Sequence, residues 1–199
     1  MRKTVLLFAA MATTLLLASG VALAVIKTGG PGDDVLYGTN RPDILNGLRG
    51  DDVLYGRGGD DIAPDGSGLK GGEGDDTIYG GAGNDMMEGG NYQLFFGNPN
   101  GTDYKDENSL YGGKGKDDVL GDRGSDVLYG GAGADWIIEA YNVDAVRGDT
   151  IYGGAGNDFI GSTSRPAVID KVHCGTGTDE VRADREDMVG GGCEKVVRF

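Results

Sequence analysis

The run GGKGKDDVLGDRGSDVLYGGAGADWII, residues 112–138, consists of three nine-residue units placed end to end. Each unit begins with glycine, carries aspartate at its sixth position and an aliphatic residue at its eighth, as Asp117 and Val119 do in the first. Gly-rich loop residues favour a tight turn, because glycine accepts positive φ. The last three residues suffice for one short strand whose middle side chain points to one face. The run therefore predicts short strands separated by tight turns.

The same unit recurs on both sides of this run, from Gly29 onward. In this register the sixth position holds Asp34, Asp43, Asp52, Asp61, Asp76, Asp85, Asn108, Asp117, Asp126, Asp135, Asp149, Asp158, Asp170 and Asp179. The eighth position holds Leu36, Leu45, Leu54, Ala63, Ile78, Met87, Leu110, Val119, Leu128, Ile137, Ile151, Ile160, Val172 and Val181. One apolar residue per strand cannot bury itself alone, so the units must stack to build a continuous core.

Tyrosine at the ninth position separates alternate units. It occurs only in odd-numbered units, as Tyr37, Tyr55, Tyr79, Tyr111, Tyr129 and Tyr152. Odd and even strands therefore belong to different sheets, and inserts near 65–70, 91–105 and 139–147 bulge outward without breaking the alternation. We expect an all-β fold, a right-handed parallel β-roll (β-solenoid) over residues 25–161. The tyrosine column either stacks from strand to strand or presents a binding face.

Composition agrees with an ordered, cation-binding repeat. Glycine accounts for 40 of the 199 residues, which without a strict period would indicate low complexity. The chain carries 32 acidic against 18 basic residues, a net charge of −14. Such a chain repels nucleic acid and anionic membranes and attracts cations. We therefore expect no nucleic-acid partner, and the regular placement of the aspartates directs attention to metals.

Residues 1–24 have the pattern of a secretory signal peptide. Arg2 and Lys3 precede a mostly apolar stretch, and Ala22-Leu23-Ala24 offers a cleavage site between small residues. The apolar stretch is short for a membrane span and no stop-transfer segment follows. We expect a secreted, extracellular protein with no membrane span after cleavage.

The units resemble the hemolysin-type, or RTX, calcium-binding repeat GGxGxDxUx, in which U is a large aliphatic residue. The resemblance covers roughly residues 29–161 and recurs at 170–182. It implies several Ca²⁺ ions held between loops of alternate turns, where Asp34 would face Asp52 and Asp117 would face Asp135. Carboxylate and carbonyl oxygens are the ligands that calcium prefers. The predicted metal ligands are Gly30, Gly32, Asp34, Asp43, Gly50, Asp52, Gly59, Asp61, Gly72, Gly74, Asp76, Gly83, Asp85, Gly115, Asp117, Gly124, Asp126, Gly133, Asp135, Asp149, Gly156, Asp158 and Asp179.

Without metal, two columns of carboxylates would stand about 5 Å apart, the spacing of stacked strands, and would repel one another. We therefore predict that calcium binding and folding are one event. An affinity of roughly 0.1–1 mM would suit an extracellular module. Arg41, Arg147 and the neutral Asn108 depart from the repeat and weaken individual sites.

Residues 162–199 are predicted to cap the open end of the roll with terminal repeats. Cys174 and Cys193 are the only cysteines, and a secreted chain favours a disulfide between them over two free thiols. His173 is the only histidine, which makes a Ser-His-Asp triad or an HExxH zinc site a poor explanation.

We find no catalytic constellation and expect an extracellular structural or binding module rather than an enzyme. Two alternatives stay open. The tyrosine column and the aromatic insert at 91–105 would suit an adhesin for polysaccharide or another cell-surface partner. The chain would also suit the non-catalytic part of a secreted enzyme.

Overall fold

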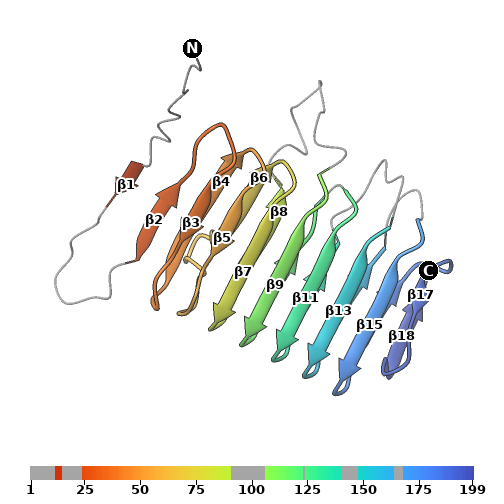
Figure 1. Cartoon of the computed structure of the whole chain (residues 1–199). Helices are drawn as coiled ribbons and strands as arrows, with labels where there is room; N and C mark the ends of the chain where they lie inside the picture. The colour runs from red at the N-terminus through yellow and green to blue at the C-terminus, as the bar shows by residue number, and fades with distance from the viewer. Residues whose placement is uncertain (1–11, 15–23, 91–105, 123, 140–147, 164–167) are drawn as a thin grey trace, which may run out of the picture.

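The computed structural model describes residues 12–14, 24–90, 106–122, 124–139, 148–163 and 168–199, and these form a flattened coil of stacked strands (Figure 1). One sheet contains the strands β1 (Ala12–Thr14), β2 (Val25–Thr28), β4 (Asp43–Arg49), β6 (Leu69–Glu73), β8 (Met86–Gly90), β10 (Asp118–Leu120), β12 (Trp136–Ile138), β14 (Phe159–Ser162), β16 (Glu180–Ala183) and β18 (Lys195–Arg198). The other contains β3 (Val35–Tyr37), β5 (Val53–Tyr55), β7 (Thr77–Ala82), β9 (Ser109–Lys114), β11 (Val127–Ala132), β13 (Thr150–Ala155), β15 (Lys171–Thr176) and β17 (Met188–Val189). Every pairing is parallel except that of β1 with β2.

The predicted alternation of odd and even units between two sheets is confirmed. Tyr37 pairs with Tyr55, and Tyr55 with Tyr79, so equal positions of alternate units stand side by side. The register is unchanged across residues 91–105, because β7 pairs with β9 through Ile78 and Leu110. The fifteen residues 91–105 therefore do not shift the register of the strands on either side of them.

The core is a single file of apolar side chains from the two sheets. The eighth-position residues predicted for it are fully buried, with Ala63 as the one exception. Burying each such side chain contributes about 1.5–3 kcal/mol. Because each strand supplies one such residue, the stability of a turn depends on the turns stacked against it.

The fourth unit corrects the predicted register. Leu69, not Ala63, pairs with Leu45 and Met87 and is 1% exposed. Residues 62–67 leave the coil instead of the predicted 65–70, and Gly68 re-enters it. A leucine buries more apolar surface than an alanine. The chain therefore places Leu69 in the core and loops out residues 62–67.

The first residue of the insert predicted at 139–147, Glu139, lies in the stacked coil. The Glu139 N–H donates to the Gly161 carbonyl (3.1 Å), the bond that position-one residues such as Gly121 make to the next turn. Glu139 therefore belongs to the stacked turn. The predicted aromatic insert at 91–105 and the rest of 139–147 lie outside the described residues.

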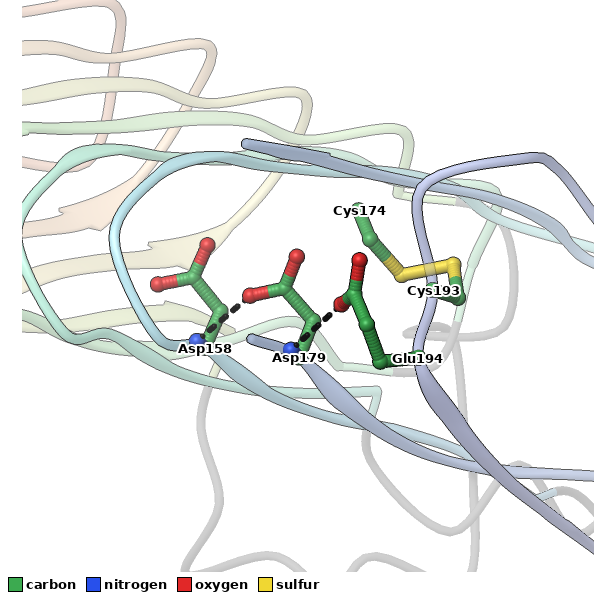
Figure 2. The surroundings of a disulfide bond; sticks show 5 residues. All are labelled: Asp158, Cys174, Asp179, Cys193 and Glu194. Atoms are coloured by element: carbon green, nitrogen blue, oxygen red, sulfur yellow. Dashed lines mark hydrogen bonds between the residues drawn. A yellow bond between two sulfur atoms is a disulfide. The ribbon is translucent and has the colours of Figure 1, made fainter. Parts of the chain in front are cut away.

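The coil continues into the stretch predicted as a cap. Strands β15 and β16 pair with β13 and β14, and the short β17 and β18 follow them. The predicted disulfide is confirmed: it joins Cys174 in β15 to Cys193 in the loop before β18, with 5.3 Å between their Cα atoms (Figure 2). It ties the last turn to the one beneath it.

Among the described residues there is no helix with the length and apolar character needed to cross a membrane. Most of the predicted signal peptide lies outside the described residues.

Candidate metal centre

The sixth-position side chains form two buried ladders. Each Oδ1 accepts the backbone N–H of the sixth-position residue one turn earlier, at 2.7–3.1 Å. The odd ladder comprises Asp34, Asp52, Asp76, Asn108, Asp126, Asp149, Asp170 and Asp187. The even ladder comprises Asp43, Asp61, Asp85, Asp117, Asp135, Asp158, Asp179 and, at its end, Glu194, which accepts the Asp179 N–H (Figure 2). The ladders place the aspartates of alternate nine-residue units next to one another, as the period predicted.

We call each residue of a ladder a rung. The second carboxylate oxygen of most rungs has no hydrogen-bond partner. This buried Oδ2 atom belongs to Asp52, Asp61, Asp76, Asp85, Asp117, Asp135, Asp149, Asp158, Asp170 and Asp179. Leaving a buried charged acceptor unpaired is strongly unfavourable, and a metal ion is one of the few groups that offsets the cost. Two rows of such oxygens along the coil are thus what a row of cations requires.

Glycine at the first position lies beside seven of these oxygens, those of Asp52, Asp61, Asp76, Asp85, Asp117, Asp135 and Asp158. A Cβ added to Gly130 would lie 2.6 Å from Asp135 Oδ2 and 2.7 Å from the carbonyl oxygen of Gly153, one turn further on. The same two kinds of oxygen converge within 2.7 Å of the hypothetical Cβ at Gly29, Gly38, Gly47, Gly56, Gly71, Gly80, Gly112 and Gly153. Except beside Asp34 and Asp43, this carboxylate oxygen and this carbonyl oxygen face one space without a donor between them, and such a pair matches the oxygen ligands of calcium.

The sequence pattern did not single out these first-position glycines as part of the site. It named glycines at the second and fourth positions, and for most of these the structure gives a packing reason that does not extend to Gly30 and Gly32. Gly72 and Gly74 have φ of 133° and 126°, and a Cβ on either would collide with the backbone of the preceding turn. Whether their carbonyl groups also bind metal stays a prediction. The first-position glycine matters for a different reason: the absence of its side chain leaves space beside the aspartate Oδ2. The repeat period alone does not reveal that space.

Three predicted ligands differ from the other rungs. The second oxygens of Asp34, Asp43 and Asp126 accept the N–H groups of Gly30 (2.5 Å), Thr39 (2.5 Å) and Asp122 (2.9 Å). These carboxylates are satisfied by the backbone, and the remaining rungs are the stronger candidates for metal.

Asn108 shows that a rung needs an oxygen but not a charge. Its Oδ1 accepts the Asp76 N–H at 2.8 Å, as a carboxylate would, and its Nδ2 donates to Asp122 Oδ1 at 3.1 Å. The amide therefore preserves the ladder while removing one negative charge from the site.

Burial changes the acidity of the rungs. It raises the pKa of Asp61 and of Asp76 from the ordinary 3.8 to about 8, and that of Asp117 to about 7. The hydrogen bond from the backbone N–H opposes this effect, and the neighbouring carboxylates reinforce it. The folded ladder therefore disfavours the ionised form near neutral pH unless a cation accompanies it.

The tyrosine column stacks from strand to strand. Neighbouring rings from Tyr37 to Tyr152 have centroids 4.6–5.1 Å apart and planes within 11° of parallel. His173 continues the column on Tyr152 at 4.9 Å. The rings cover one another's faces, so the column offers ring edges rather than a flat aromatic platform, and His173 has a packing role.

Comparison with known proteins agrees with this geometry. The family model of the RTX calcium-binding nonapeptide repeat matches in four copies, at residues 28–63, 69–91, 106–138 and 148–162, which together exceed half of the chain. The first two copies leave out residues 64–68, which comprise most of the loop 62–67 and the Gly68 that follows it. The comparisons with curated proteins and with solved structures give no match.

Proposed function

Because the chain belongs to the RTX calcium-binding nonapeptide repeat family, we propose that it is a secreted protein whose turns bind several calcium ions and fold as they bind them. It serves as an extracellular structural or binding module and not as an enzyme. The observation that carries the proposal is the double row of buried, unpartnered Oδ2 atoms along the two ladders.

The donor set supports calcium in particular. Each space between turns offers a carboxylate Oδ2 and a carbonyl oxygen of a first-position residue, as Asp135 and Gly153 do. Both are hard oxygen donors, and calcium accepts six to eight of them in flexible geometry. Magnesium demands a tighter octahedron and keeps its waters, so it fits this set less well.

Coupling of binding to folding follows from the same charges. Without cations, stacking a turn buries another carboxylate beside those of its neighbours, and one apolar side chain per strand offsets only part of that cost. Bound calcium reverses the balance, so the free energy of binding becomes free energy of folding.

Calorimetric titration of the whole chain with calcium, together with far-ultraviolet circular dichroism, tests this proposal. We expect several ions per chain and a rise of β-structure over the same calcium range, with magnesium much weaker. A full β spectrum in calcium-free buffer that calcium leaves unchanged would refute the coupling. The absence of calcium binding would refute the function.

A matched pair of variants assigns the effect to the ladder. Asp117→Asn removes the charge of a buried rung but keeps an oxygen for the Asp85 N–H, as Asn108 does naturally. Asp118→Asn removes an equal charge from the adjacent, half-buried strand residue. We expect only Asp117→Asn to lower the number of ions bound or to weaken one site at least tenfold. Equal effects of both variants would mean that overall charge, not the ladder, governs binding.

Secretion has its own test. N-terminal sequencing of the protein recovered outside the cell should start at Val25 if residues 1–24 are a cleaved signal peptide. Extracellular protein that retains these residues, or protein found only inside the cell, would contradict this part of the proposal.

A further inference from the structure

Glu139 breaks the first-position rule in a way that gathers three carboxylates. In the neighbouring units the first position is glycine, whose missing side chain leaves room beside the aspartate of its own unit. Glu139 occupies this position on the backbone, yet its side chain is 3% exposed. Its carboxylate lies against Asp149, the rung of its own unit, and Asp170, the rung of the next turn.

The three carboxylates are close enough to share one ion. One oxygen from each lies within 4.8 Å of the other two. Two oxygens bound to one calcium ion at 2.3–2.6 Å are at most about 5 Å apart. The spacing therefore fits ligands on different sides of a single cation.

Three oxygens of the cluster receive no hydrogen bond from outside it. Glu139 Oε1, Asp149 Oδ2 and Asp170 Oδ2 are buried, and the groups within their reach are one another's carboxylates, so a cation or a shared proton has to offset their charge. The other oxygens of the two aspartates are used by the ladder, where Asp149 accepts the Asp126 N–H and Asp170 accepts the Asp149 N–H. Among the described residues, no lysine or arginine forms an ion pair with any of the three.

We propose that Glu139, Asp149 and Asp170 form a three-carboxylate cation site in the odd ladder, distinct in composition from the carboxylate-plus-carbonyl sites of the regular turns. The inference rests on the proposed calcium-binding function and adds a site that the nine-residue pattern does not contain. Three carboxylates concentrate more negative charge than one Oδ2 and a carbonyl. This site therefore binds calcium more tightly than a regular turn and favours trivalent lanthanide ions still more.

Glu139→Gln in the whole chain tests the site, with Glu186→Gln as the control for an equal loss of charge on an exposed residue. The readouts are the number of calcium ions per chain in flow dialysis and the affinity of the tightest class of sites in a terbium titration. We expect Glu139→Gln to lose one ion, or to weaken the tightest site at least tenfold, while Glu186→Gln matches the parent chain.

The outcomes separate this inference from the general function. If the parent chain binds no calcium, the proposed function fails. If it binds calcium and Glu139→Gln keeps the same number of ions and the same affinities, the three-carboxylate site fails alone, and protons rather than a metal join these carboxylates. If Glu139→Gln does not fold, anomalous diffraction from terbium-soaked crystals of the parent chain decides. A peak between the three carboxylates supports the site, and peaks elsewhere without one there overturn it.

Discussion

At the scale of single residues, the sixth-position aspartate and the first-position glycine act together. Asp135 Oδ1 accepts the Asp117 N–H in the ladder while its Oδ2 stays free, and Gly130 keeps the space beside that free oxygen open. The pair explains why the unit begins with glycine, independently of the turn geometry required at its second and fourth positions.

Gly130→Ala should therefore cost both stability and calcium. Its Cβ would lie 2.6 Å from Asp135 Oδ2, which is closer than such atoms approach. We expect a loss of about 1–3 kcal/mol in the free energy of unfolding, as overpacking typically causes, and weaker binding at one site. Urea unfolding in excess calcium measures the first effect and calorimetry the second. Gly191→Ala is the control, because a Cβ there meets nothing within 4 Å; equal stability of the two variants would contradict the prediction.

At the scale of the strand and its loop, the core position is set by side-chain size as well as by spacing. The fourth unit places Leu69 in the file of buried residues and loops out residues 62–67. The register also holds from β7 to β9, although residues 91–105 lie between these strands in the sequence.

Leu69→Ala and Ile62→Ala distinguish the observed register from the simpler nine-residue count. Leu69 is fully buried, so its truncation should cost about 2–5 kcal/mol. Ile62 is 42% exposed, so its truncation should stay within about 0.5 kcal/mol of the parent chain. Thermal or urea unfolding in calcium provides the comparison. If Ile62→Ala were the more destabilising variant, the predicted register with Ala63 at the core position would be correct instead.

The assignment of strands to two sheets and the aspartate ladders were predictable from the sequence. The alternation of Tyr37, Tyr55 and Tyr79 predicted the two sheets, because every ninth residue returns to the same face and every second unit to the same sheet. The aspartate ladders followed from the same period. The shift to Leu69 did not, since a strict count gives no weight to side-chain volume. Glu139 was hidden for another reason: it lies where the pattern stops, and its partners come from its own unit and the next turn.

The Cys174–Cys193 disulfide closes the last turn of the roll. Replacing both Cys174 and Cys193 by alanine should lower the free energy of unfolding by roughly 3 kcal/mol, the value for a loop of about this length in the chain-entropy model. Calcium binding should keep its stoichiometry, because the ladder rungs Asp179 and Glu194 remain. Denaturant unfolding and calorimetry of the double variant measure both. An unchanged midpoint would show that the disulfide leaves the stability of the roll unaffected.

At the scale of the whole molecule, the ladders make stability depend on pH in opposite directions with and without calcium. The pKa values of Asp61 and Asp76 are about 8 in the folded chain and near 3.8 when unfolded, so the metal-free folded state holds more protons between these limits. Stability of the metal-free roll is therefore greatest below about pH 4 and falls as the pH rises through 8. Calcium needs the ionised carboxylates, so its affinity rises over the same interval.

Urea unfolding in calcium-free buffer at pH 5 and pH 8, repeated in excess calcium, checks both signs. In calcium-free buffer we expect more folded chain at pH 5 than at pH 8, where the roll should be largely unfolded, and we expect the gain from calcium to be larger at pH 8. A metal-free midpoint that rises with pH would show that the buried aspartates are stabilised as anions by the protein alone.

The stacked tyrosines have an optical consequence for the intact chain. Six phenol rings held about 5 Å apart and nearly parallel are chromophores in contact, and their electronic transitions couple along the whole column. Unfolded, the same rings are independent absorbers. The near-ultraviolet dichroism of the protein thus reports assembly of the roll as a collective signal, separate from that of Trp136, which is 52% exposed outside the column.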